Sequence, residues 1–137
     1  MAYTEIFGDR GMKVNTVVDK KAEAIIHTVT GEITYEGIKS SYESARSLPD
    51  FQENMNSIWD IRDADASKFD SQDVIKTARY FETQTKNRAE YKTAVIVSRD
   101  LEHGVSKIYQ VAAADLPAKI RVFNNLEEAK KWITGSD

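Results

Sequence analysis

Apolar and polar residues alternate along the chain in a pattern that predicts strands and helices in turn. Residues 14–18 and 24–30 are rich in β-branched side chains and flank a polar segment, which predicts an antiparallel hairpin. Short apolar runs at 57–61, 94–97 and 120–123 have the length of buried strands. Four further stretches place apolar residues at helical spacing. Their predicted inward stripes are Ile38, Tyr42 and Ala45; Val74, Ala78, Phe81 and Thr85; Leu101, Val105, Ile108, Ala112 and Leu116; and Leu126, Ala129 and Ile133.

Capping residues and helix breakers predict where these helices begin and end. Thr34 is placed to cap the first helix, and the second is expected from about residue 71 to about residue 88. The two prolines of the chain follow the first and third predicted helices, which they cannot continue. Asn124 and Glu127 fit a capping box at the start of the last helix. Gly135 is expected to close that helix.

The predicted order of elements is β-β-α-β-α-β-α-β-α, which is typical of an α/β domain. Short apolar strands between amphipathic helices indicate a mostly parallel, five-stranded sheet with an antiparallel edge hairpin and helices packed on both faces. We expect a single domain over residues 1–137, with its core at about residues 14–133. Ligands of such sheets gather outside the carboxyl ends of the strands. The loops to inspect first are those that follow Thr30, Ile61, Ser98 and Phe123.

Composition and charge exclude several classes of function. The chain has no cysteine, so it cannot form disulfides, thiolate metal sites or a cysteine nucleophile. Its net charge of −3 argues against a broad nucleic-acid-binding surface. No apolar run approaches the roughly 20 residues of a membrane span, and the N-terminus lacks the apolar core of a signal peptide. We therefore expect a cytoplasmic protein without a membrane span.

The order of elements and three segments resemble the SpoIIAA-like group of the STAS superfamily, which is named for anti-sigma-factor antagonists. The most specific segment is 122–133, VFNNLEEAKKWI, which resembles the last strand and helix of that group. Residues 58–63, IWDIRD, are similar to its central strand, and residues 92–98 to the next strand. The likeness extends over residues 14–133 and implies a SpoIIAA-like fold.

The same resemblance implies a candidate interaction or phospho-switch loop. In regulatory STAS domains, an Asp-Ser-Ser/Thr-Gly segment begins a helix, and a partner kinase phosphorylates one of its hydroxyls. Asp70 and Ser71 match that segment here, whereas Gln72 and Asp73 replace the second hydroxyl and the glycine. Asp70 and Asp73 would repel a phosphate on Ser71, and a capping role explains Asp70 or Ser71 more simply. The residues of the predicted loop are Asp60, Asp63, Asp70, Ser71, Gln72 and Ser98.

Other candidate chemistry yields no predicted catalytic residue, metal site or cofactor. Five aspartates lie between residues 60 and 73, but their spacing fails the calcium-loop template and they are expected to be solvated. His27 lies in a predicted strand and His103 in the first turn of a predicted helix, without a catalytic partner at a recognisable spacing. The glycines form neither a dinucleotide-binding nor a phosphate-binding loop.

Two functions of different classes follow. The resemblance implies a non-catalytic interaction or regulatory module that docks a protein partner, or a second copy of itself, near the helix that begins at Ser71. The alternative is a carrier or sensor of a small apolar ligand or lipid, because the fold also resembles lipid-binding CRAL-TRIO (Sec14-like) domains. The small residues 112–114 are expected to leave space for such a ligand. An enzyme is the third interpretation, and no motif supports it.

Overall fold

The structure is a computed structural model that describes residues 3–7 and 11–135. Six strands and four helices follow one another along this part of the chain. The strands are β1 (Tyr3–Phe7), β2 (Lys13–Asp19), β3 (Ala24–Glu32), β4 (Asn56–Asp65), β5 (Tyr91–Ile96) and β6 (Ala118–Phe123). The helices are α1 (Tyr35–Ala45), α2 (Ser71–Thr85), α3 (Asp100–Ala112) and α4 (Leu126–Thr134).

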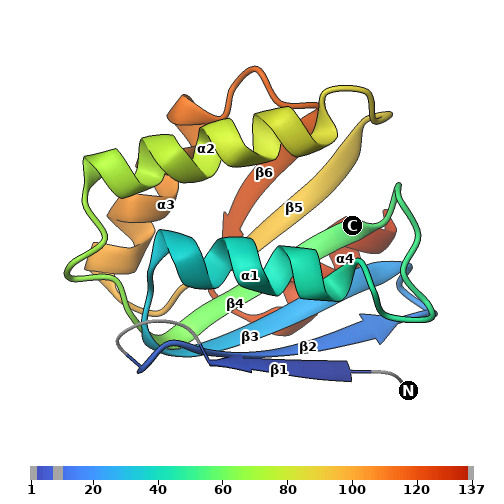
Figure 1. Ribbon diagram of the computed structural model, residues 1–137, viewed down its shortest axis with the longest axis horizontal. Helices are drawn as coiled ribbons and strands as arrows, with labels where there is room; N and C mark the ends of the chain where they lie inside the picture. The colour runs from blue at the N-terminus through green and yellow to red at the C-terminus, as the bar shows by residue number, and fades with distance from the viewer. Residues whose placement is uncertain (1–2, 8–10, 136–137) are drawn as a thin grey trace.

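The strands form one sheet in the order β1-β2-β3-β4-β5-β6 (Figure 1). The pairs β1–β2 and β2–β3 are antiparallel, and the pairs from β3 to β6 are parallel. The predicted α/β class, edge hairpin and mostly parallel arrangement are therefore confirmed. The strand number is corrected from five to six, because β1 pairs outside β2. An edge strand needs only backbone partners on one side, and its mixed polar sequence gave no apolar run to detect.

Helices cover both faces of the sheet, with α1, α2 and α3 on one face and α4 on the other (Figure 1). We call the face under α1, α2 and α3 the cavity face. Its strand side chains include Ile25, His27, Trp59, Ile61 and Val95. We call the opposite face the α4 face. Its strand side chains include Ala24, Ile58, Ala94, Ile96 and Phe123.

Caps hold the helices at the predicted places, with one correction. Thr34 caps α1, since its hydroxyl accepts a hydrogen bond from the Gly37 N–H at 2.9 Å. Gly135 closes α4 in the left-handed conformation, at φ 76°. The N-cap of α4 is Asn125 and not Asn124, because the Asn125 side chain accepts from the Glu128 N–H at 2.8 Å. The predicted N-cap was therefore one residue too early.

The predicted inward stripe of the third helix was correct at Val105, which packs against the buried core, and at Leu116, which is 8% exposed, but it was wrong at Leu101, Ile108 and Ala112. Leu101 and Ile108 are 49% and 53% exposed. The helix instead buries Glu102 and Ser106. These residues recur at helical spacing as well, but their polarity hid them from a pattern of apolar residues. Of residues 112–114, which were expected to leave space, only Ala113 is buried, and it packs in a cluster with Ala78 and Leu116.

The longest helix, α2, has 15 residues. Within residues 3–7 and 11–135, no helix combines the length and the apolar character needed to cross a bilayer.

Candidate functional site

The predicted residues Asp60 and Ser98 are connected through Arg62. Asp60 lies on the α4 face and is 8% exposed. Its carboxylate accepts from the Arg62 guanidinium at 2.9 and 2.7 Å and from the Arg62 N–H at 3.2 Å. This hydrogen-bonded pairing raises the pKa of Arg62. The Ser98 hydroxyl donates to the Arg62 carbonyl oxygen at 3.0 Å, so these groups fix the carboxyl end of β4.

The predicted residues Asp70, Ser71 and Gln72 begin α2. Asp70 is the N-cap, and its carboxylate accepts from the Asp73 N–H at 3.0 Å. The Asp73 carboxylate accepts in return from the Asp70 N–H at 3.1 Å. The capping role expected for Asp70 is therefore confirmed. Ser71 and Gln72 are exposed, and their role in an interaction or phospho-switch stays a prediction.

The predicted loop thus falls into two groups on different faces of the sheet. Side chains alternate between the faces of a strand, and Trp59, next to Asp60, lines the cavity face. Asp60 therefore faces α4, whereas α2 begins on the cavity side (Figure 1). Asp63 is exposed between the two groups.

Four of the five aspartates of residues 60–73 accept separate local hydrogen bonds, namely Asp60, Asp65, Asp70 and Asp73. Asp65 accepts from the Ser67 N–H at 2.8 Å, which lowers the pKa of its carboxyl group. Over the described ranges, no three acidic or histidine side chains converge on a site for a metal ion.

A buried carboxylate that the sequence pattern did not identify lies at the carboxyl ends of the strands. Glu102 is 1% exposed, and its carboxylate accepts from Arg99 Nε at 2.8 Å and from the Ala66 N–H at 3.4 Å. Arg99 also donates to the Ala64 carbonyl oxygen. These bonds tie the start of α3 to the segment that follows β4.

A cavity of about 120 Å³ lies between the cavity face of the sheet and helices α1, α2 and α3. Its lining is mostly aliphatic and aromatic. The sheet contributes His27, Trp59, Ile61 and Val95, and the helices contribute Ile38, Phe81, Val105 and Tyr109. Its size is close to that of an engineered apolar cavity of roughly 150 Å³ that binds benzene.

His27 forms part of the cavity wall. It is 1% exposed, shares a 2.8 Å hydrogen bond between Nδ1 and the Thr16 hydroxyl, and stacks on Trp59 at 3.8 Å between ring centroids. Burial lowers the pKa of His27 to about 3. The ring is therefore neutral at ordinary pH and adds no charge to the cavity wall.

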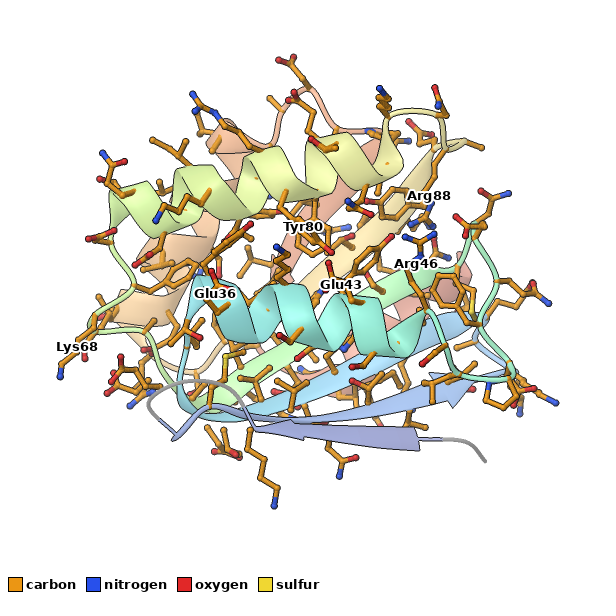
Figure 2. All side chains as sticks on the ribbon, in the orientation of Figure 1. Glu36, Glu43, Arg46, Lys68, Tyr80 and Arg88 are labelled. Atoms are coloured by element: carbon orange, nitrogen blue, oxygen red, sulfur yellow. The ribbon has the colours of Figure 1, made fainter. Side chains whose placement is uncertain are left out.

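Polar contacts join α1 and α2, two of the three helices that cover the cavity. The Tyr80 hydroxyl of α2 donates to Glu43 of α1 at 3.0 Å, and Figure 2 shows these side chains pointing toward one another. Arg46, just after α1, donates to Gln84 of α2 at 3.2 Å. Burial raises the pKa of Tyr80, so its hydroxyl keeps the proton that it donates. Two side-chain hydrogen bonds thus connect α1 and its C-terminal end to α2 above the cavity.

One end of the cavity is polar. Arg88, just after α2, lines it together with Tyr91 and Thr93 of β5 and Ser57 of β4. The Arg88 guanidinium carbon lies 3.9 Å from the centroid of the Tyr91 ring. The hydroxyls of Ser57 and Thr93, which are register partners, lie 3.1 Å apart. The cavity therefore has an apolar body and a polar end.

Sequence reasoning did not identify the cavity residues as one site. Phe81 was expected to face inward, and it does. No spacing within the chain connects it to Arg88, Tyr91 or Tyr109, since the lining comes from strands and helices brought together only by the fold. The one local signal for the polar end was Arg88, a cationic residue that follows an amphipathic helix and precedes a strand beginning with the aromatic Tyr91.

Comparison with known proteins identifies the fold. The structure is similar to the crystal structure of a protein from Shewanella loihica, described as an uncharacterised protein of the DUF3478 family with a SpoIIAA-like fold. The TM-score is 0.57, the sequence identity is 18%, and the match covers 97% of this chain and 98% of that chain. The fold is therefore SpoIIAA-like, as the sequence resemblance predicted. No family model matches the sequence, and no curated protein matches it.

Proposed function

We propose that this protein binds a small apolar ligand in the cavity under α1, α2 and α3, as a carrier or sensor of that ligand. The observation that supports the proposal is the preformed apolar cavity of about 120 Å³. A cavity of this size next to the core lowers stability unless a ligand fills it. Small-molecule sites are concave, mostly apolar and largely preformed, with a few polar groups that orient the ligand.

The acidic residues of the predicted loop already have partners within the fold, which favours ligand binding in the cavity over protein docking through that loop. Asp60 pairs with Arg62, and Asp70 caps the start of α2. The interaction or regulatory role implied by the resemblance stays a prediction. If it holds, the protein is expected to bind a protein partner or a second copy of itself.

The first experiment measures what the purified protein retains and what it takes up. Native mass spectrometry of freshly purified protein is expected to show a bound small molecule that organic solvent releases. Added octan-1-ol or 3-phenylpropan-1-ol is expected to raise the melting temperature, since a ligand of the native state stabilises it. Binding is also expected to change the fluorescence of Trp59, which lines the cavity.

Two variants of α3 distinguish the cavity from the protein surface. Ser106 is 5% exposed and lines the cavity, so Ser106→Leu is expected to fill it and to abolish the response to both alcohols. Ala112 is exposed on the same helix, so Ala112→Leu adds similar bulk outside and is expected to leave the response unchanged. A bare mass in the spectrometer, together with no response of the unmodified protein to either alcohol, would contradict the proposal.

A further inference from the structure

The guanidinium of Arg88 is only partly satisfied by the protein. One terminal nitrogen donates to the Met55 carbonyl oxygen at 2.9 Å, and the group stacks on Tyr91. The Nε–H is buried and has no acceptor among the residues that the structure describes. An arginine offers five donors in a planar fork, so this side chain retains hydrogen-bonding capacity at the edge of the cavity.

The carboxylates of nearby segments are committed to other partners. Glu53, in the loop that also contains Met55, lies 3.4 Å from Arg46, and Glu90 lies 3.5 Å from Lys119. Within residues 3–7 and 11–135, Arg88 itself forms no ion pair. Figure 2 shows Arg46 and Arg88 at the same end of the helix pair. This end of the cavity is thus cationic, and Arg88 is the cation there that also lines the cavity.

The remaining polar groups of this end favour an anionic head group of small size. The hydroxyls of Ser57 and Thr93 line the same cavity, and burial raises the pKa of the Tyr91 hydroxyl, which keeps its proton. None of these groups adds negative charge, and because one hydroxyl of the Ser57–Thr93 pair donates to the other, one hydroxyl proton of the pair stays available for a ligand. A planar carboxylate is the acceptor that matches the fork of a guanidinium.

We propose, on the basis of the function proposed above, that the ligand is a small apolar carboxylate. Its carboxylate binds the Arg88 guanidinium, and its aliphatic or aromatic body lies toward Trp59 and Phe81. The body replaces empty space against an apolar wall, and the head group supplies the acceptor that the Arg88 Nε–H lacks.

The experiment compares acids with the alcohols of the same skeleton. Octanoate is paired with octan-1-ol, and 3-phenylpropanoate with 3-phenylpropan-1-ol, at a pH where both acids are ionised. Dissociation constants are measured by fluorescence in a Trp132→Phe background, where Trp59 is the remaining tryptophan. Each acid is expected to bind at least about tenfold more tightly than its alcohol, the effect of a hydrogen bond to a charged group.

Variants of two arginines assign the preference to a residue. Arg88→Met is expected to bring the acid-to-alcohol ratio close to one. Arg79→Met removes an equal charge from an exposed position of α2 and is expected to keep the ratio of the unmodified protein. Arg88→Lys keeps the charge but loses the fork, and is expected to give an intermediate ratio.

The outcomes separate this inference from the function on which it rests. Equal binding of acid and alcohol by the unmodified protein, or an unchanged ratio in Arg88→Met, would overturn the role of Arg88 and leave apolar binding intact. Failure of the unmodified protein to bind any of the four compounds would overturn both. Where Arg88→Met does not fold, the NMR signal of the Arg88 Nε–H decides: it is expected to shift with octanoate and not with octan-1-ol, and a shift with neither overturns the inference.

Discussion

The two faces of the sheet use the same strands and are packed in opposite ways. On the α4 face, small residues, Ala24, Ala94 and Ala129, are fully buried between one helix and the sheet, with Ile58 and Ile96 beside them. On the cavity face, three helices present aromatic side chains to an aromatic strand surface. Small residues allow a helix to lie close to the strands and to reach the density typical of protein interiors.

Large rings have the opposite effect on the cavity face. His27 stacks on Trp59, Trp59 meets Phe81 edge-on at 6.5 Å, and Phe81 meets Tyr42 at 5.1 Å. Rings that contact one another in fixed geometry hold the helices above the sheet and leave space between them. One face of the sheet is therefore closely packed, and the other encloses the cavity in which we propose that a ligand binds.

The largest expected effect is on the tightly packed face. Ile58 is 0% exposed in the α4 cluster, so Ile58→Ala is expected to lower the free energy of unfolding by about 2–5 kcal/mol. Ile120 is half-buried beside the cavity, so Ile120→Ala removes fewer contacts and is expected to cost less. Urea unfolding measures both. Equal losses would show that the two faces are packed alike.

The second prediction concerns pH and the cavity face. Burial lowers the pKa of His27 from 6.5 to about 3, so the unfolded chain binds this proton more readily between those values. His27 therefore does not change the free energy of unfolding above pH 6.5. As the pH falls from 6.5 toward 3, it lowers the free energy of unfolding by about 1.4 kcal/mol for each pH unit. His27→Asn is expected to remove this part of the pH dependence of the unfolding free energy.

The control for this prediction is the exposed His103. His103→Gln is expected to follow the pH dependence of the unmodified protein, since the carboxylates that also titrate in acid are common to all three proteins. An identical slope for His27→Asn would show that His27 is protonated in the folded state.

The sequence predicted most of the fold because its strands and three of its helices follow simple periodicities. The edge strand β1 and part of the buried face of α3 were missed for physical reasons. β1 needs backbone pairing more than apolar side chains, and α3 buries Glu102 and Ser106, which a pattern of apolar residues places outside. Glu102 is tolerated inside because Arg99 and the Ala66 N–H satisfy its carboxylate.

The candidate site was less accessible to prediction than the fold. The capping role of Asp70 depends on residues 70–73 alone and was predicted. The cavity depends on the separation between helices and sheet, which is determined by how rings such as Trp59 and Phe81 meet across the fold. The proposed role of Arg88 depends in addition on the Tyr91 ring, in the strand that follows it, and on the Met55 carbonyl oxygen, in a loop far before it. No regular spacing in the sequence connects these three residues.

The third prediction adds the same side chain to each face. Ala129 is 0% exposed under α4, so Ala129→Leu is expected to cost about 1–3 kcal/mol through overpacking. Ser106→Leu extends into the cavity and is expected to change stability by less than about 1 kcal/mol, because the added methyl groups fill existing space. Thermal unfolding of the two variants gives the comparison. A large loss for Ser106→Leu and none for Ala129→Leu would reverse the assignment of the faces.

The smallest effect concerns how α2 is held over the cavity. The Asp70 carboxylate caps the first turn of this helix through the Asp73 N–H, so Asp70→Ala is expected to lower the free energy of unfolding by about 1 kcal/mol. Asp70→Ser keeps a good capping residue and is expected to be nearly neutral, as is Gln72→Ala at an exposed position. Chemical denaturation distinguishes a cap from an interaction residue. Equal stability of Asp70→Ala and Asp70→Ser would show that the cap contributes nothing and would return Asp70 to the list of candidate contacts for a partner.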